Sequence, residues 1–169
     1  MAQSGSDLAV RRTRVWGLLS GLLVVVGIAA LAVWHSQHPA PLTVEERTVT
    51  ATVPVDQAVY VGVAAAPTGR TLHLSGVKVH TTSNTDVEVT PLLCRDGRLE
   101  ATTEPEAYCS ELVNPEGTTL GVADSIVLRV TSDQPAVAVI DPVRLGFRES
   151  LQWGTLPTGA GAVVRVLAR

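Results

Sequence analysis

The chain is poor in lysine, in aromatic residues and in cysteine. Lys78 is the single lysine among 169 residues, and the aromatic residues make up 4%. Residues 43–169 carry ten Lys and Arg against fifteen Asp and Glu, a net charge of about −5. Nucleic acids and anionic lipid surfaces attract positively charged proteins, so this main part of the chain is not expected to bind them electrostatically.

Sequence motifs that carry catalysis are absent as well. The chain has no G-x-S-x-G, S-x-x-K or H-E-x-x-H motif, and no glycine-rich loop of the kind that cradles phosphate. Ser75, His80 and Asp86 could be read as a catalytic triad, but such a set is expected by chance in a chain with this many serines and aspartates. The sequence therefore predicts no enzyme, no catalytic residue and no cofactor.

One long apolar run dominates the N-terminal part of the chain. Residues 15–34 carry no charged side chain, and 20 helical residues span about 30 Å, the thickness of the hydrocarbon core of a bilayer. The flanking residues indicate the orientation, because positive charge stays in the cytoplasm and tryptophans favour the two interfaces. They are Arg11, Arg12 and Arg14 before the run, and Trp16 and Trp34 at its two ends.

These features predict a single-pass signal-anchor helix with a cytoplasmic basic tail at 1–14, a bilayer span at 15–34, a proline-containing linker at 35–42 and an extracytoplasmic domain at 43–169. The alternative is a secretory signal cleaved near Ala32, after the small-residue pattern Ala30-Leu31-Ala32. In both cases the rest of the chain lies outside the cytoplasm. Gly17 and Gly21 form a G-x-x-x-G pair that would allow weak self-association of two helices.

The two cysteines, Cys94 and Cys109, both fall in the domain assigned to the outside. Cysteines in an oxidising compartment usually form disulfides, and their spacing is too wide for a C-x-x-C redox pair. A disulfide between them is expected, closing a short loop that has its own acidic side chains. This loop is either a recognition element or a solvated excursion that needs a covalent staple.

The domain after residue 42 has the pattern of strands throughout. Val, Thr and Leu alternate with polar residues, and Gly and Pro interrupt them about every ten residues. The apolar phase shifts by one residue at Gly76, which predicts a β-bulge. The segment 120–130 is expected to be one strand, 154–161 a Pro/Gly-rich connector, and 163–167 the last strand. The predicted fold class is all-β, an immunoglobulin-like antiparallel β-sandwich, with a small β-barrel as the alternative.

Two weaker ligand hypotheses come from this domain. The first is calcium binding by the acidic region 94–117, which lacks the calcium-loop motif. The second is metal binding by His73 and His80, which share a face if the bulge at Gly76 is present but have no third ligand nearby in sequence. We therefore expect no metal residues. The predicted function is a non-catalytic membrane-anchored module that binds or assembles with another envelope or membrane protein. An envelope solute-binding or metal-ion-binding domain is the alternative, and an enzyme is the third.

Overall fold

The computed structural model describes the backbone of residues 7–168 and the side chains of residues 21–168, in two compact units, Met1–His38 and Pro39–Arg169. Helix α1 (Asp7–Ser36) belongs to the first unit and all strands belong to the second. Five residues with predicted roles in topology or self-association lie outside the described side chains: Arg11, Arg12, Arg14, Trp16 and Gly17.

Helix α1 contains the predicted span 15–34. In the part of the chain that the structure describes, no helix combines the length and the apolar character that a membrane span requires. The span, of which residues 15–20 lie outside the described side chains, stays a prediction. At the end of the helix, His38 closes back onto the last turn. Its Nδ1 lies 2.7 Å from the carbonyl oxygen of Trp34, and the His38 and Trp34 rings stack with centroids 4.1 Å apart.

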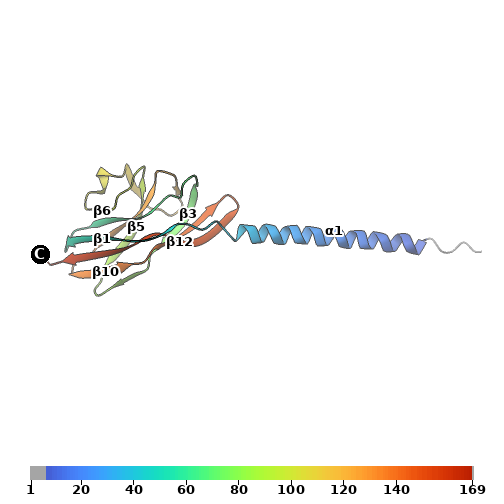
Figure 1. Ribbon diagram of the computed structural model, residues 1–169, viewed down its shortest axis with the longest axis horizontal. Coiled ribbons are helices and arrows are strands. Elements are labelled where there is room, and N and C mark those ends of the chain that lie inside the picture. Colours follow the sequence, from blue (N-terminus) through green and yellow to red (C-terminus); the bar gives the residue numbers. More distant parts are fainter. Residues whose placement is uncertain (1–6, 169) are drawn as a thin grey trace, which may run out of the picture. The chain divides into compact units, whose positions relative to one another are not determined.

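The strands of the second unit form two sheets, as Figure 1 shows. The seven-stranded sheet has the order β4-β10-β12-β11-β3-β8, with β1 also paired to β12. Its strands are β1 (Val44–Pro54), β3 (Leu72–Lys78), β4 (Thr81–Ser83), β8 (Thr119–Leu120), β10 (Ala136–Ile140), β11 (Val143–Glu149) and β12 (Gln152–Leu167). The five-stranded sheet has the order β6-β2-β9-β5-β7. Its strands are β2 (Val59–Ala65), β5 (Glu88–Arg95), β6 (Ala101–Thr102), β7 (Glu111–Val113) and β9 (Ser125–Thr131).

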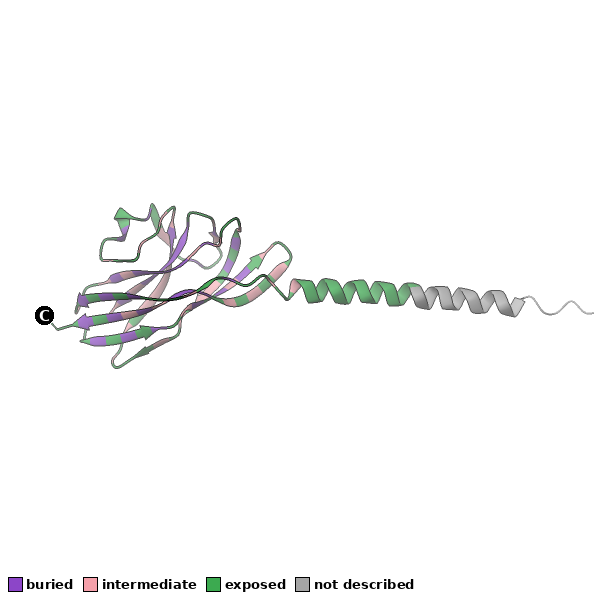
Figure 2. Cartoon of the chain, viewed as in Figure 1, coloured by how far each residue is buried: buried purple, intermediate pink, exposed green. Residues whose placement is uncertain are grey.

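The two sheets enclose a hydrophobic core (Figure 2). Buried and exposed residues alternate along β1 and β10, whereas β2 and β9 are buried along nearly their whole length. Leu74 and Phe147 contribute to it from the seven-stranded sheet, and Val61, Leu93 and Leu128 from the five-stranded sheet. This arrangement is consistent with the predicted β-sandwich. Within the described residues, β1 and β12 pair in parallel and the other strand pairs are antiparallel.

The β-bulge predicted at Gly76 is confirmed. The register between β11 and β3 shifts after the pair Gly146 and Gly76, so that Phe147 faces Leu74 and Ser75 is the extra residue. Gly76 has a φ of +156°, a conformation that residues with a side chain rarely adopt. The single strand predicted at 120–130 was wrong, because a turn at 121–124 separates β8 from β9.

Strand β12 is the longest strand, and it begins where a connector was predicted. Residues 154–161 are part of this strand, so the connector was wrong. Gln152–Thr158 pairs with β11, and the strand then continues between β10 and β1 from Gly159 onward. Gly159 has a φ of +75°, and an added Cβ would lie 2.0 Å from the carbonyl oxygen of Val63 on the other sheet. Glycine is required at this change of partners because only it fits both the backbone conformation and the close approach.

Candidate functional site

The predicted disulfide is present and closes a loop at one side of the five-stranded sheet. Cys94 on β5 and Cys109, just before β7, are joined with their Cα atoms 5.2 Å apart, and both cysteines are buried. Since β5 and β7 are neighbours in one sheet, the bond does not bridge the two sheets. Inside the loop, β6 pairs with β2, and the 3-10 helix η1 (Pro105–Ala107) precedes Cys109.

Close backbone packing holds the start of this loop. Asp96 has a φ of +50°, and an added Cβ on the next residue, Gly97, would lie 1.8 Å from the carbonyl oxygen of Tyr108. Ser110 Oγ donates to the Arg95 carbonyl oxygen at 3.1 Å, and Ser125 Oγ donates to the Gly97 carbonyl oxygen at 2.8 Å. The loop is therefore tied down by hydrogen bonds as well as by the disulfide.

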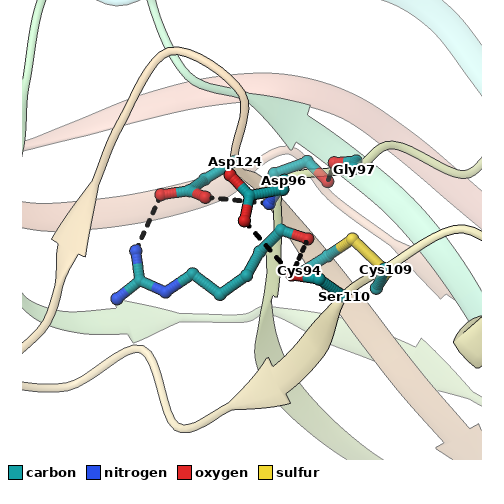
Figure 3. The surroundings of a disulfide bond; sticks show 8 residues. Cys94, Asp96, Gly97, Cys109, Ser110 and Asp124 are labelled. Carbon is teal, nitrogen blue, oxygen red and sulfur yellow. Dashed lines mark hydrogen bonds and ion pairs between the residues drawn. A yellow bond between two sulfur atoms is a disulfide. The ribbon is translucent and has the colours of Figure 1, made fainter.

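Asp124 is a buried charge next to this loop, and its carboxylate accepts three hydrogen bonds, of which Figure 3 shows those from Arg95 and from the Asp96 N–H. Its donors are the backbone N–H of Gly121 at 2.8 Å, the backbone N–H of Asp96 at 3.2 Å and Nη1 of Arg95 at 2.7 Å. Arg95 Nη1 also lies 2.7 Å from the carbonyl oxygen of Thr119 on β8. Because Arg95 belongs to the five-stranded sheet and β8 to the seven-stranded sheet, this pair links the two sheets.

The same contacts determine the protonation of Asp124. Burial raises the pKa of a carboxyl group, but the N–H groups of Gly121 and Asp96 and the Arg95 guanidinium together outweigh burial. The pKa of Asp124 is thus lowered from its ordinary value, and the group is a carboxylate at neutral pH. A carboxylate with three donors in place is suited to holding structure, and it is not placed as a general base that takes up a proton.

The described residues of the second unit line several open hollows, including three of different size. The first, of about 480 Å³, is acidic and is lined by Asp56, Asp86, Val87, Glu88, Thr131, Ser132 and Asp133. The second, of about 120 Å³, includes Arg47 and Arg98 beside the close contact of Gly62 with Leu99. The third, of about 360 Å³, lies between β3 and β5 and includes Gly76 and Pro91. Among the four described groups with a shifted pKa, Arg47 is the one that lines one of these three hollows.

Arg47 lines the second hollow and has a raised pKa. The pKa of this exposed guanidinium is raised by its hydrogen bond to Glu45, which also lines that hollow. Arginine is charged at any physiological pH, so the shift creates no acid or base for catalysis. The first and second hollows are thus lined in part by charged side chains.

The two histidines of the weaker ligand hypothesis lie at different places in the chain. His73 lies on β3 and His80 lies in the connection between β3 and β4. Within the described residues, no group of three His, Cys, Asp or Glu side chains is placed to hold a metal ion. In the acidic region 94–117, Asp96 accepts a hydrogen bond from Ser110 Oγ at 3.2 Å, while the glutamates Glu100, Glu104, Glu106, Glu111 and Glu116 are exposed.

Removing the disulfide is expected to lower the free energy of unfolding by about 3 kcal/mol, the chain-entropy value for a loop of 15 residues. The change is the double substitution Cys94→Ala and Cys109→Ala, measured by urea titration of the full-length protein in detergent. Wild-type protein treated with a thiol reductant is the control and should show the same loss. Labelling of both cysteines by a maleimide in unreduced, denatured wild-type protein would contradict the disulfide itself.

Sequence signals existed for the disulfide and for the Asp-Gly turn. The Arg95–Asp124 pair was missed, because the two residues are 29 positions apart and Asp124 lies inside a segment predicted as strand. Comparisons with protein-family models, with curated proteins and with solved structures found no match.

Proposed function

We propose that this chain is a single-pass membrane protein that holds a non-catalytic β-sandwich outside the cytoplasm, for binding or assembly with another envelope or membrane protein. The observation that carries the proposal is the apolar helix. Nine large apolar side chains between Leu22 and Trp34 are 55–72% exposed in α1. Burying such a side chain is worth about 1.5–3 kcal/mol, so a helix of this kind is stable where something apolar covers it.

A lipid bilayer is the cover that fits the sequence best. The uncharged run 15–34 has the length of a span, and the arginines at 11, 12 and 14 precede it. The disulfide supports an oxidising compartment for the domain, since such bonds are rare in the cytoplasm. The immunoglobulin-like class remains part of this proposal, supported by two sheets around one core in a domain of this size.

The topology can be tested by cysteine labelling in intact cells, because both native cysteines are in the disulfide. In full-length protein, Val137→Cys should react with a membrane-impermeant maleimide, since Val137 is 45% exposed on the domain. Ser4→Cys, in the basic tail, should react only after the membrane is permeabilised. Labelling of Ser4→Cys in intact cells would refute the orientation.

The anchor itself can be tested by alkaline carbonate extraction of the membranes. Wild-type protein should stay in the membrane pellet, whereas the double variant Leu23→Arg and Val26→Arg should be released. Each arginine at the centre of a span costs about 2.5–3.5 kcal/mol. Leu23→Ala with Val26→Ala is the matched control and should stay in the pellet. A mature wild-type protein that begins after Ala32 would show that the segment is a cleaved signal and not an anchor.

A further inference from the structure

The hairpin between β11 and β12 presents two large apolar side chains at its tip. Leu151 is 78% exposed and Trp153 is 54% exposed, whereas Phe147 on the same hairpin is 2% exposed in the core. The turn is short, since Glu149 pairs with Gln152, and Ser150 has the positive φ of +53° that tight hairpins often require. Trp153 therefore does not anchor the core but projects from a well-formed turn.

The same hairpin is fastened to the first residues of the domain. Arg70 Nε donates to Glu149 Oε1 at 3.0 Å, and the Arg70 guanidinium also lies 3.3 Å from the Pro41 carbonyl oxygen and 3.4 Å from the Ala40 carbonyl oxygen. Hydrogen bonding to Arg70 lowers the pKa of Glu149, so the pair is charged at neutral pH. The Pro39 ring packs against Gly154, where an added Cβ would lie 2.8 Å from Pro39 Cγ.

Each unit has contacts of its own at the boundary between His38 and Pro39. His38 is bonded to the last turn of α1, and Pro39 is packed on the hairpin. Consecutive Cα atoms are 3.8 Å apart, so one peptide link joins a residue held by the helix to a residue held by the domain. If α1 is anchored in a bilayer, the part of the domain around Pro39 must be near the surface of that bilayer.

We infer that the hairpin tip, Leu151 with Trp153, is seated in the membrane–water interface of the bilayer that α1 would span. This inference rests on the proposed function, because it needs the bilayer that α1 would occupy. An exposed leucine next to a tryptophan suits that interface, where the indole keeps its N–H near water and buries its rings. Arg148, exposed and directly opposite Trp153 in the hairpin, has a guanidinium that matches the phosphate of a phospholipid.

The experiment is depth-resolved tryptophan quenching in full-length protein reconstituted into phosphatidylcholine vesicles. Trp16→Phe with Trp34→Phe leaves Trp153 as the single tryptophan. Its emission should be strongly reduced by lipids brominated near the headgroup and little affected by aqueous iodide. Leu151→Ser in the same background should weaken the quenching by brominated lipid, because the tip loses an apolar contact while the core is unchanged.

Two further single-tryptophan proteins serve as controls. Trp16→Phe with Trp153→Phe leaves Trp34, which reports on the anchor. Val137→Trp, with all three native tryptophans changed to Phe, places the probe opposite Arg165, twelve residues along β12 from Trp153 and about 40 Å away. This probe should be quenched by iodide and not by brominated lipid.

The outcomes distinguish a failure of the tip contact from a failure of the membrane anchor. If Trp34 is quenched by brominated lipid and Trp153 is quenched by iodide alone, the anchor stands and the tip contact is refuted. If Trp34 is also untouched by brominated lipid, the anchor fails, and the tip contact fails with it. A Trp153 that is shielded from both quenchers would be covered by protein, which also overturns the inference.

Discussion

Gly159→Ala is expected to lower the free energy of unfolding by about 4 kcal/mol, close to the largest effects seen for single substitutions. Two costs add together, a left-handed backbone conformation for a residue with a Cβ and overpacking against a neighbour that cannot move. The neighbour is backbone, since the added Cβ would lie 2.0 Å from the Val63 carbonyl oxygen. Urea titration of the full-length protein in detergent, followed by circular dichroism of the strands, measures the loss.

Gly69→Ala is the matched control for this prediction. Gly69 has nearly the same backbone conformation, with a φ of +71°, but an added Cβ would meet nothing within 4 Å. The control should lose about 1–2 kcal/mol, the cost of the conformation alone. Equal losses in the two variants would show that the close approach of β12 to β2 contributes nothing to stability.

Gly159 also shows why the end of the chain was difficult to predict. Its neighbours Pro157 and Gly161 interrupt the apolar pattern, so the segment has the composition of a turn. In the structure, Pro157 lies in the first half of β12, which pairs with β11 and not yet with β1. A proline is tolerated there because its missing N–H leaves no strand partner without a donor. Composition describes local preference, whereas the strand is formed by partners from three other segments of the chain.

The features that were predicted correctly depend on short stretches of sequence. The shift of the apolar phase around Gly76 requires an extra residue in β3, whichever strand pairs with it. Cys94 and Cys109 are the two cysteines of the sequence, so a disulfide within the chain can join only these two. The hairpin tip is a contrast. Leu151 and Trp153 have the composition of core residues, and their exposure follows from the position of the turn between β11 and β12.

Trp153 and helix α1 share one property, the exposure of large apolar side chains. Such side chains are exposed both in α1 and at the tip of the β11–β12 hairpin. Residues 39–42, assigned to a linker from their prolines, contact the domain instead, and Leu42 is buried in its core.

Asp124→Ala is expected to cost about 4 kcal/mol, because removing one partner of a buried ion pair leaves the other groups unsatisfied. The Gly121 N–H, the Asp96 N–H and one donor of Arg95 would all lose their acceptor, and the link between the sheets would weaken. Asp124→Asn keeps one acceptor oxygen and loses the charge, so a smaller loss is expected. Asp133→Asn makes the same chemical change at an exposed position and should have little effect.

The pH dependence of the free energy of unfolding distinguishes the effect of the Asp124 charge from the effect of its shape. Since its pKa is lowered in the folded protein, the carboxylate stabilises the fold above the ordinary pKa of 3.8, and this contribution is lost as the pH falls below that value towards the folded pKa. Glu149 contributes in the same direction, because its pKa is also lowered. Urea titrations of the wild type and of Asp124→Asn at pH 7 and about pH 3 should therefore converge at the lower pH. An undiminished difference at low pH would mean that the asparagine acts through geometry, and that the Arg95–Asp124 attraction adds nothing to the link between the sheets.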